Sequence, residues 1–158
     1  MTYSSAIFED LDGDLTSPDA SGEALHFAQL RKMKHILRKA RIQPGHHILD
    51  VGAGWGSMAI LIAQTIPDTK IDALTLSVDQ LEIAQERIEA AGLQERITFH
   101  LMDYRNMPPE WEGAFDRYVS IEMIEHVGKD FLETYWSTVD WAVEKEGRGG
   151  CHSSDHNA

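Results

Sequence analysis

Apolar runs of about five residues alternate with longer segments of helical periodicity along most of the chain. Between residues 21 and 42 apolar residues recur every three or four positions, which predicts a helix with Ser21 as its N-cap and Pro44-Gly45 after its end. Downstream, the pattern predicts strands over 46–51, 70–76, 96–101 and 115–121, and helices over 57–66, 77–92 (with Gly92 as C-cap) and 130–145. Strands and helices alternating at these spacings indicate right-handed βαβ units and a parallel α/β sheet.

The pattern stops at residue 146. The segment EGRGGCHSSDHNA has neither an apolar run nor an alternation, so we expect an irregular tail over 146–158 and no fifth strand. The remainder, 1–145, divides into an N-terminal helical segment (1–42) and a βαβ core (43–145). A four-stranded sheet of this kind leaves an edge uncovered.

The charged residues limit the classes of partner that this protein could bind. The 26 acidic and 14 basic residues give a net charge of −12, which argues against general nucleic-acid binding because phosphates would be repelled. Six of the basic residues lie between Arg31 and Arg41, which predicts one cationic surface. The single cysteine, Cys151, and a start without a basic region or a long apolar run favour a cytoplasmic chain.

The loop after the first strand is rich in glycine. HILDVGAGWG carries Gly52, Gly54 and Gly56 at a tighter spacing than the G-x-G-x-x-G of dinucleotide sites, which favours a smaller ligand. The next helix would present its positive end to a carboxylate. The alternative is a turn that needs glycine only for its backbone angles. Polar motifs at 75–80, 102–105 and 122–128 follow the other strands, so we expect all of them at one sheet edge.

Five motifs in order carry a family resemblance. YSSAIF (3–8), QPGHHILDVGAGWG (43–56), TLSVDQ (75–80), MDYR (102–105) and SIEMIEHVG (120–128) resemble the cyclopropane-fatty-acyl-phospholipid synthases, which include the mycolic acid cyclopropane synthases. The resemblance covers about residues 2–146 and implies a Rossmann-like class I methyltransferase sheet, with parallel strands and flanking helices, that is incomplete at the C-terminus. Two departures are Ser5 and Ala53, where the family usually has cysteine.

The resemblance implies S-adenosylmethionine as cofactor and assigns residues to it. Tyr3 and Ser4 touch the cofactor; Gly52, Gly54 and Gly56 hold its methionine part; Thr75 and Gln80 hold the ribose; Asp103 and Tyr104 hold the adenine; and Asp50 and Leu76 belong to the same site. These residue types suit the task, since Gln80 offers a donor and an acceptor to a diol. The Tyr3 and Trp55 rings could also stabilise the sulfonium cation, although Trp55 could equally be a packing residue.

The resemblance also implies a reaction. A methyl or methylene group is transferred to the cis double bond of an unsaturated fatty-acyl phospholipid, and a bound bicarbonate takes up the released proton. The family glutamate that holds bicarbonate matches Glu125, which we expect to be tuned by burial; Glu122 and His126 would have supporting roles. The alternative for Glu125 is a residue favoured at a helix start.

Several alternatives stay open. The basic helix could contact anionic phospholipid headgroups at a membrane surface, or be a solvated face. Cys151, His152, Asp155 and His156 include metal-ligating types but lack the usual paired spacing, and His152 falls near a family histidine that lies on a strand. The chain could also be a non-catalytic remnant that binds only the cofactor, or a small-molecule N-methyltransferase relative.

Overall fold

The computed structural model describes residues 5–9, 24–145 and 150–153. The strands are β1 (His47–Val51), β2 (Lys70–Thr75), β3 (Ile97–Leu101), β4 (Arg117–Ser120) and β5 (Gly150–Ser153). The α-helices are α2 (Leu25–Lys39), α3 (Ser57–Thr65), α4 (Val78–Ala90), α5 (Ile124–Val127) and α6 (Leu132–Ala142), and the 3-10 helices are η1 (Tyr104–Asn106), η2 (Pro109–Trp111) and η3 (Lys129–Phe131). Within the described residues, no helix has both the length and the apolar character needed to cross a bilayer.

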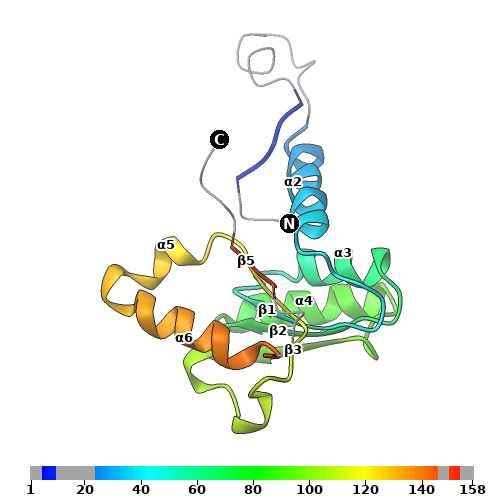
Figure 1. The fold of residues 1–158 in the computed structure, drawn as a ribbon. Coiled ribbons are helices and arrows are strands. Elements are labelled where there is room, and N and C mark those ends of the chain that lie inside the picture. Colours follow the sequence, from blue (N-terminus) through cyan, green and yellow to red (C-terminus); the bar gives the residue numbers. More distant parts are fainter. Residues whose placement is uncertain (1–4, 10–23, 146–149, 154–158) are drawn as a thin grey trace.

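The sheet is parallel throughout, and its strand order is β3-β2-β1-β4-β5 (Figure 1). The chain first builds outward from β1 to β3 and then returns to the other side of β1 to place β4. The strand order therefore reverses between β1 and β4. In open α/β sheets, ligands bind beyond the carboxyl ends of the strands at such a reversal.

The fifth strand corrects the expected irregular tail. Gly150–Ser153 pairs with β4 in parallel, with His152 opposite Val119. Pairing at a sheet edge uses backbone groups and needs no apolar side chains, which is why hydrophobic alternation did not reveal this strand. It also places His152 on a strand, which the sequence did not predict.

Capping explains where the elements start and stop. In α4, the Ser77 side chain accepts a hydrogen bond from the Gln80 backbone N–H (3.3 Å), and Gly92 follows the helix in the left-handed conformation, one residue beyond the C-cap. At the start of α2, Ala24 holds the N-cap position, and the predicted Ser21 lies outside the described residues. The predicted helix over 130–145 is shorter, because η3 precedes α6 and α6 ends at Ala142.

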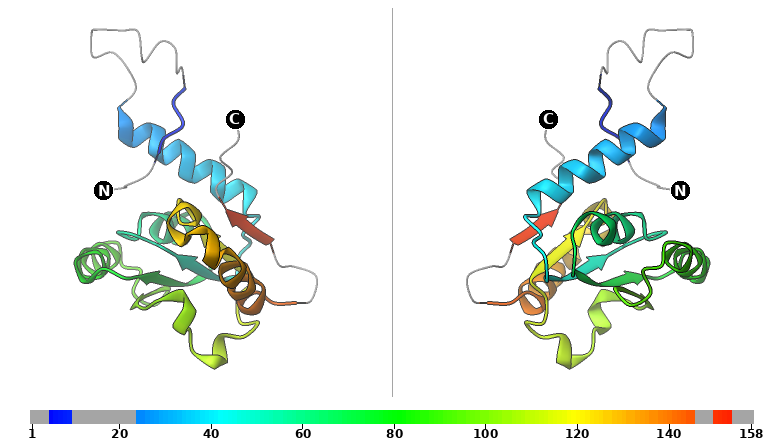
Figure 2. Two further views of the ribbon diagram at one scale, coloured as in Figure 1. Left: turned by 90° about the vertical axis from the view of Figure 1, so that its left-hand side faces the viewer. Right: turned by 90° about the vertical axis from the view of Figure 1, so that its right-hand side faces the viewer.

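Helices cover both faces of the sheet (Figure 2). On one face, α2, α3 and α4 pack against strand residues such as Ile48, Ile71 and Phe99. On the other face, α6 and η1 cover Leu49, Val51 and Leu74 through aromatic side chains. The inner strands β1 and β4 are thus buried from both sides, as expected for a parallel sheet, whereas β3 at the edge is partly exposed.

Two of the six residues of the basic segment do not contribute freely to the cationic surface that the sequence predicts. Lys32 is buried, and Arg31 forms an ion pair with Glu9 (3.3 Å) and donates to the Ile7 carbonyl (2.9 Å). These contacts hold residues 5–9 beside α2, together with the bond from the Ile7 N–H to the Ala28 carbonyl. The positions that remain exposed are Lys34, Arg38, Lys39 and Arg41.

Candidate functional site

A cavity of about 320 Å³ opens at the point where the strand order reverses. Its volume lies at the lower end of the roughly 300–1,000 Å³ of small-molecule sites. The wall is built from the ends of β1 and β2 and from the segments that follow the four strands β1 to β4, and α2 closes one side with Lys32 and Met33. The four predicted motif regions after the strands therefore meet at one edge of the sheet, as expected.

The glycine loop forms the floor of this cavity. Gly52 and Gly54 line it and have positive φ angles of 77° and 56°. The N–H groups of Gly52 and Ala53 both donate to the Leu74 carbonyl (3.2 and 2.9 Å), which fastens the loop to the end of β2. A side chain at Gly54 would meet no atom within 4 Å, so this glycine leaves open the space that a ligand needs.

Gly56 has a different task from the one expected. It is buried, does not line the cavity, and forms the N-cap of α3 with a φ of 75°. A Cβ there would lie 3.2 Å from Phe99 and 3.4 Å from Ala84, so this glycine lets the helix pack closely on the sheet and on α4. From α4, Arg87 donates to the Trp55 carbonyl (2.5 Å), which holds the loop with Trp55 on the cavity wall.

Asp50 brings a buried carboxyl to the cavity. It ends β1 on the wall, is 2% exposed, and has no hydrogen-bond partner for Oδ2 among the described residues. Burial raises the pKa of Asp50 to about 7. A buried acceptor without a partner costs free energy, so this oxygen is suited to a donor brought by a ligand, above all a cationic one.

The end of β2 supplies a second polar pair. Thr75 is buried and its hydroxyl donates to Gln80 Oε1 (2.6 Å), so that the Gln80 amide is fixed on the cavity wall at the start of α4. Leu76 also lines the cavity and is 69% exposed, unusual for an apolar side chain of this size. All three line the cavity, and their contacts with a cofactor stay predictions.

Of the two residues predicted to hold the adenine, Tyr104 lines the cavity and Asp103 does not. Tyr104 is buried on the cavity wall and packs edge-on against Tyr135. Asp103 is not among the lining residues; its carboxylate accepts from Arg105 Nε (2.9 Å) and Nη2 (2.5 Å) and caps η1. The Arg105 bonds outweigh burial and lower the pKa of Asp103. Tyr3 and Ser4 lie outside the described residues.

Glu125 is not buried, contrary to expectation. It lies exposed on the short helix α5 and is not among the residues that line the cavity. The neighbouring glutamate, Glu122, lines the cavity instead, together with His126. The difference arises because Glu122 has a φ of +52°, and this left-handed residue turns the chain between β4 and α5.

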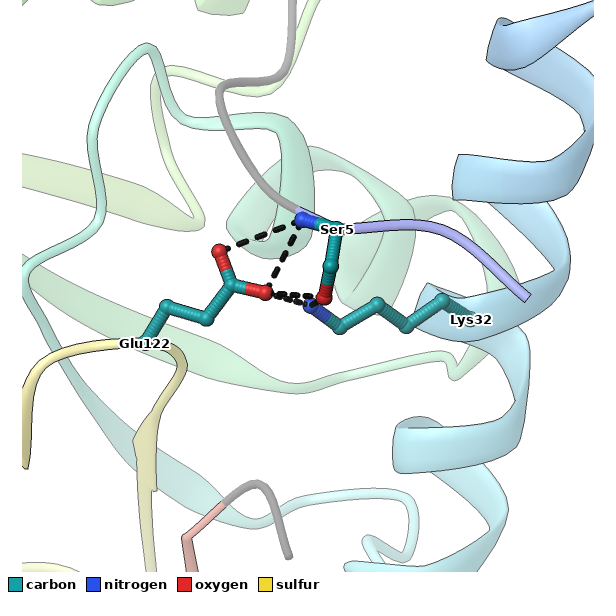
Figure 3. Close-up of polar contacts among 3 residues, drawn as sticks. All are labelled: Ser5, Lys32 and Glu122. Carbon is teal, nitrogen blue, oxygen red and sulfur yellow. Dashed lines mark hydrogen bonds and ion pairs between the residues drawn. The ribbon is translucent and has the colours of Figure 1, made fainter. Parts of the chain in front are cut away.

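Glu122 forms a polar cluster with Ser5 and Lys32 (Figure 3). Its carboxylate accepts from the Ser5 N–H (2.9 Å to Oε1 and 3.2 Å to Oε2), from the Ser5 hydroxyl and from Lys32 Nζ. Burial alone would raise the pKa of Glu122, but the hydrogen bonds from Lys32 and Ser5 outweigh it and lower that pKa. The Lys32 side chain is 8% exposed, so this carboxylate supplies the counter-charge that a buried ammonium requires.

The sequence contained one signal for this cluster. Lys32 lies four residues after Ala28 and four before Ile36, within the apolar stripe of its helix. A lysine at such a position is expected to be buried and paired. Its partner could not be read from the chain, because Glu122 is ninety residues away.

The C-terminal residues show no metal site that can be described. Cys151 and His152 lie on β5, whereas Asp155 and His156 fall outside the described residues. Within the part of the chain that the structure describes, no group of three or more His, Cys, Asp or Glu side chains is placed to hold a metal.

The relatives of this chain include enzymes named for acting on lipids. A probable fatty acid methyltransferase of Pseudomonas putida and the cyclopropane-fatty-acyl-phospholipid synthase of Escherichia coli K12 are each 37% identical over 93% of the chain. The alignments cover 34% and 33% of those proteins, so the chain spans about a third of their length.

A solved structure agrees. The crystal structure of a mycolic acid cyclopropane synthase complexed with SAH and CTAB superposes with a TM-score of 0.79 at 28% identity, covering 96% of this chain and 47% of that one. The sequence profile of the mycolic acid cyclopropane synthetase family matches residues 1–157. The chain therefore belongs to the mycolic acid cyclopropane synthetase family, with the class I methyltransferase fold that its sequence predicted.

Proposed function

We propose that this chain binds S-adenosylmethionine in the cavity between β1, β2 and β4 and transfers a methyl or methylene group to the cis double bond of an unsaturated phospholipid acyl chain. One observation carries the proposal: Asp50, the open glycine loop and the Thr75–Gln80 pair meet on one wall at the reversal of strand order. The family relatives support the choice of cofactor and of substrate class.

The residues present fit this cofactor. Asp50 Oδ2, buried without a partner among the described residues, would accept a hydrogen bond from the cofactor's ammonium group. Gly52 and Gly54 would leave room for its methionine backbone, and the Thr75–Gln80 pair would offer hydrogen bonds to the ribose hydroxyls. Tyr104 offers an aromatic surface for the adenine, and Trp55 one for the sulfonium.

The remainder of the wall suits an acyl chain. Four methionines and four large aliphatic side chains line the cavity: Met33, Met58, Met102, Met123, Val51, Leu74, Leu76 and Ile121. Methionine adapts to irregular apolar shapes, and an apolar wall excludes water from the reacting carbons. Bound S-adenosylmethionine would supply the methyl group, while the chain's residues orient the double bond against it.

Bicarbonate does not fit the site as described. Glu125, which the resemblance assigns to it, is not on the cavity wall, and Ser5, at the family's cysteine position, is already bonded to Glu122. The proposed reaction therefore includes no proton transfer to bicarbonate. Whether Glu125 takes part in turnover stays a prediction, which Glu125→Gln tests: cofactor binding is retained and turnover is lost if Glu125 is required.

Calorimetric titration of the purified chain with S-adenosylmethionine tests the cofactor site. We expect saturable binding that falls about tenfold in Gln80→Ala, the equivalent of 1.4 kcal/mol. Gln85→Ala is the matched control, because Gln85 is an exposed residue of the same helix. A folded chain that binds no cofactor, with folding confirmed by circular dichroism, would refute the proposal.

Turnover is then measured with vesicles of cis-unsaturated phospholipid and, separately, with small amines. Mass spectrometry of the acyl chains should show the gain of a methylene unit. Methylation of the amines alone would favour the N-methyltransferase relationship. Cofactor binding without any product would favour the non-catalytic alternative.

A further inference from the structure

The Ser5–Lys32–Glu122 cluster presents a fixed anion at the cavity wall. Lys32 comes from α2, Ser5 from the segment beside α2, and Glu122 from the turn after β4 (Figure 3). Two hydrogen-bond donors on Ser5 and one ammonium on Lys32 all point at one carboxylate. This arrangement is an anion-binding site whose anion belongs to the protein itself.

The backbone conformation at Glu122 does not favour a glutamate. This indicates that the residue is needed at this position for its carboxylate. A φ of +52° is unfavourable for a residue with a Cβ and is most easily adopted by glycine. Strain of this kind persists where the surrounding contacts hold it, and it gathers at functional sites. At this position the compensating contacts are the bonds to Ser5 and Lys32.

We propose that the Glu122 carboxylate replaces bicarbonate in this chain: it occupies the anion position formed by Ser5 and Lys32 and accepts the proton released during transfer to the acyl double bond. The inference rests on the proposed function. The alkene π electrons form the new C–C bond while the S–CH₃ bond breaks and its electron pair stays on sulfur, leaving a carbocation on the neighbouring carbon. Glu122 then accepts a proton from the transferred methyl group, and the released C–H electron pair closes the ring.

The electrostatics of the cluster suit this task. The bonds from Lys32 and Ser5 lower the pKa of Glu122, so its carboxylate is charged at neutral pH and available as an acceptor. A weak base suffices, because a proton next to a carbocation is strongly acidic. A fixed carboxylate also needs no bound anion to be recruited for each turnover.

The first experiment asks where bicarbonate binds, with no need for turnover. Carbon-13 bicarbonate is titrated against the wild-type chain, Glu122→Gly and the double variant Glu122→Gly/Lys32→Met, and binding is followed by NMR. We expect no saturable binding to the wild type, binding to Glu122→Gly because Lys32 and Ser5 have lost their anion, and none to the double variant. Saturable binding to the wild type, or none to a folded Glu122→Gly, overturns the proposal.

The second experiment measures turnover in bicarbonate-free buffer. Glu122→Gln should bind S-adenosylmethionine like the wild type but turn over at least about 100-fold more slowly, the usual contribution of a positioned base. Added bicarbonate should restore turnover to Glu122→Gly and leave the wild-type rate unchanged. Glu89→Gln, an exposed glutamate on α4, is the matched control.

The outcomes separate this inference from the proposed function. The proposed function is refuted if the wild type binds no cofactor. The inference alone is refuted if the wild type is active only with bicarbonate, or if its turnover depends on Glu125 and not on Glu122. Loss of cofactor binding in Glu122→Gln overturns the role in proton transfer, because it assigns Glu122 to binding. A wild type that binds the cofactor but forms no product overturns the catalytic part of the inference.

Discussion

The buried carboxyl of Asp50 should make both the stability and the cofactor affinity of this protein depend on pH near neutrality. Burial raises its pKa from 3.8 to about 7, a difference of about 3 units. At 1.36 kcal/mol per unit, this corresponds to about 4 kcal/mol between the two protonation states. The sign follows from linkage: a raised folded-state pKa gives stability that is fully present below pH 3.8 and is lost as the pH rises through about 7.

The pH-dependent contribution of the Asp50 carboxyl to stability can be measured by urea unfolding of the cofactor-free wild type and of Asp50→Asn. The free energy of unfolding of the wild type, relative to that of the variant, should fall by about 3 kcal/mol between about pH 5 and pH 8. The comparison with Asp50→Asn is needed because the other titratable groups are the same in both proteins, so their contributions to the pH dependence of stability subtract out. A difference that stays flat over this range would refute the account of Asp50 as a carboxyl destabilised by burial.

Cofactor binding should respond in the opposite direction. A cationic ligand favours the charged carboxylate, so affinity should rise by up to about tenfold per pH unit below pH 7 and level off above it. Calorimetry between about pH 5.5 and pH 7.5 would show the slope. The other titratable groups on the wall are Lys32, Tyr104, Glu122 and His126, so a slope that persists in Asp50→Asn would assign the effect to one of them and refute the reasoning.

Three further predictions concern packing, the Thr75–Gln80 pair and the carboxylate of Asp72 on β2. Gly56→Ala should lower the free energy of unfolding in urea by about 2 kcal/mol or more, because the cost of the left-handed backbone adds to that of a Cβ 3.2 Å from Phe99. Gly92→Ala has only the backbone cost, since its Cβ meets open space, and should lower it by about 1 kcal/mol. Equal losses in the two variants would contradict the role of Gly56 in packing. Thr75→Val should weaken S-adenosylmethionine binding about tenfold in calorimetry by releasing Gln80, while Thr65→Val, at an exposed helix end, should leave it unchanged. Although burial alone would raise the pKa of Asp72, the hydrogen bonds from His100 and His47 (each 2.6 Å) lower it to about 2. Its contribution of roughly 1–2 kcal/mol, discounted for solvent screening, should be present above pH 3.8 and lost as the pH falls toward 2; an unchanged acid limb in the unfolding profile of Asp72→Asn would argue against it.

The sequence by itself determined the order of strands and helices and the position of the cofactor motifs. Apolar runs mark β1 and β4 because these inner strands are buried on both faces. The positive φ angles at Gly52, Gly54 and Gly56 are of the kind that glycine adopts most readily. Since the carboxyl ends of parallel strands share one edge, the motifs after them were bound to meet there. Asp50, Thr75 and Tyr104 all line the cavity, whereas their contacts with a cofactor stay predictions.

Only the tertiary structure decided which polar residue faces which partner. Gly56 supports packing and not the cavity wall, because α4 and β3 approach it closely. Residues 150–153 form a strand because the edge of β4 offers backbone partners, a property of the neighbour and not of the segment. Glu122 and Glu125 are three residues apart and chemically identical in the sequence. A left-handed turn and a buried lysine ninety residues away bring Glu122 and not Glu125 to the cavity, because burying the Lys32 charge is favourable only with an anion beside it.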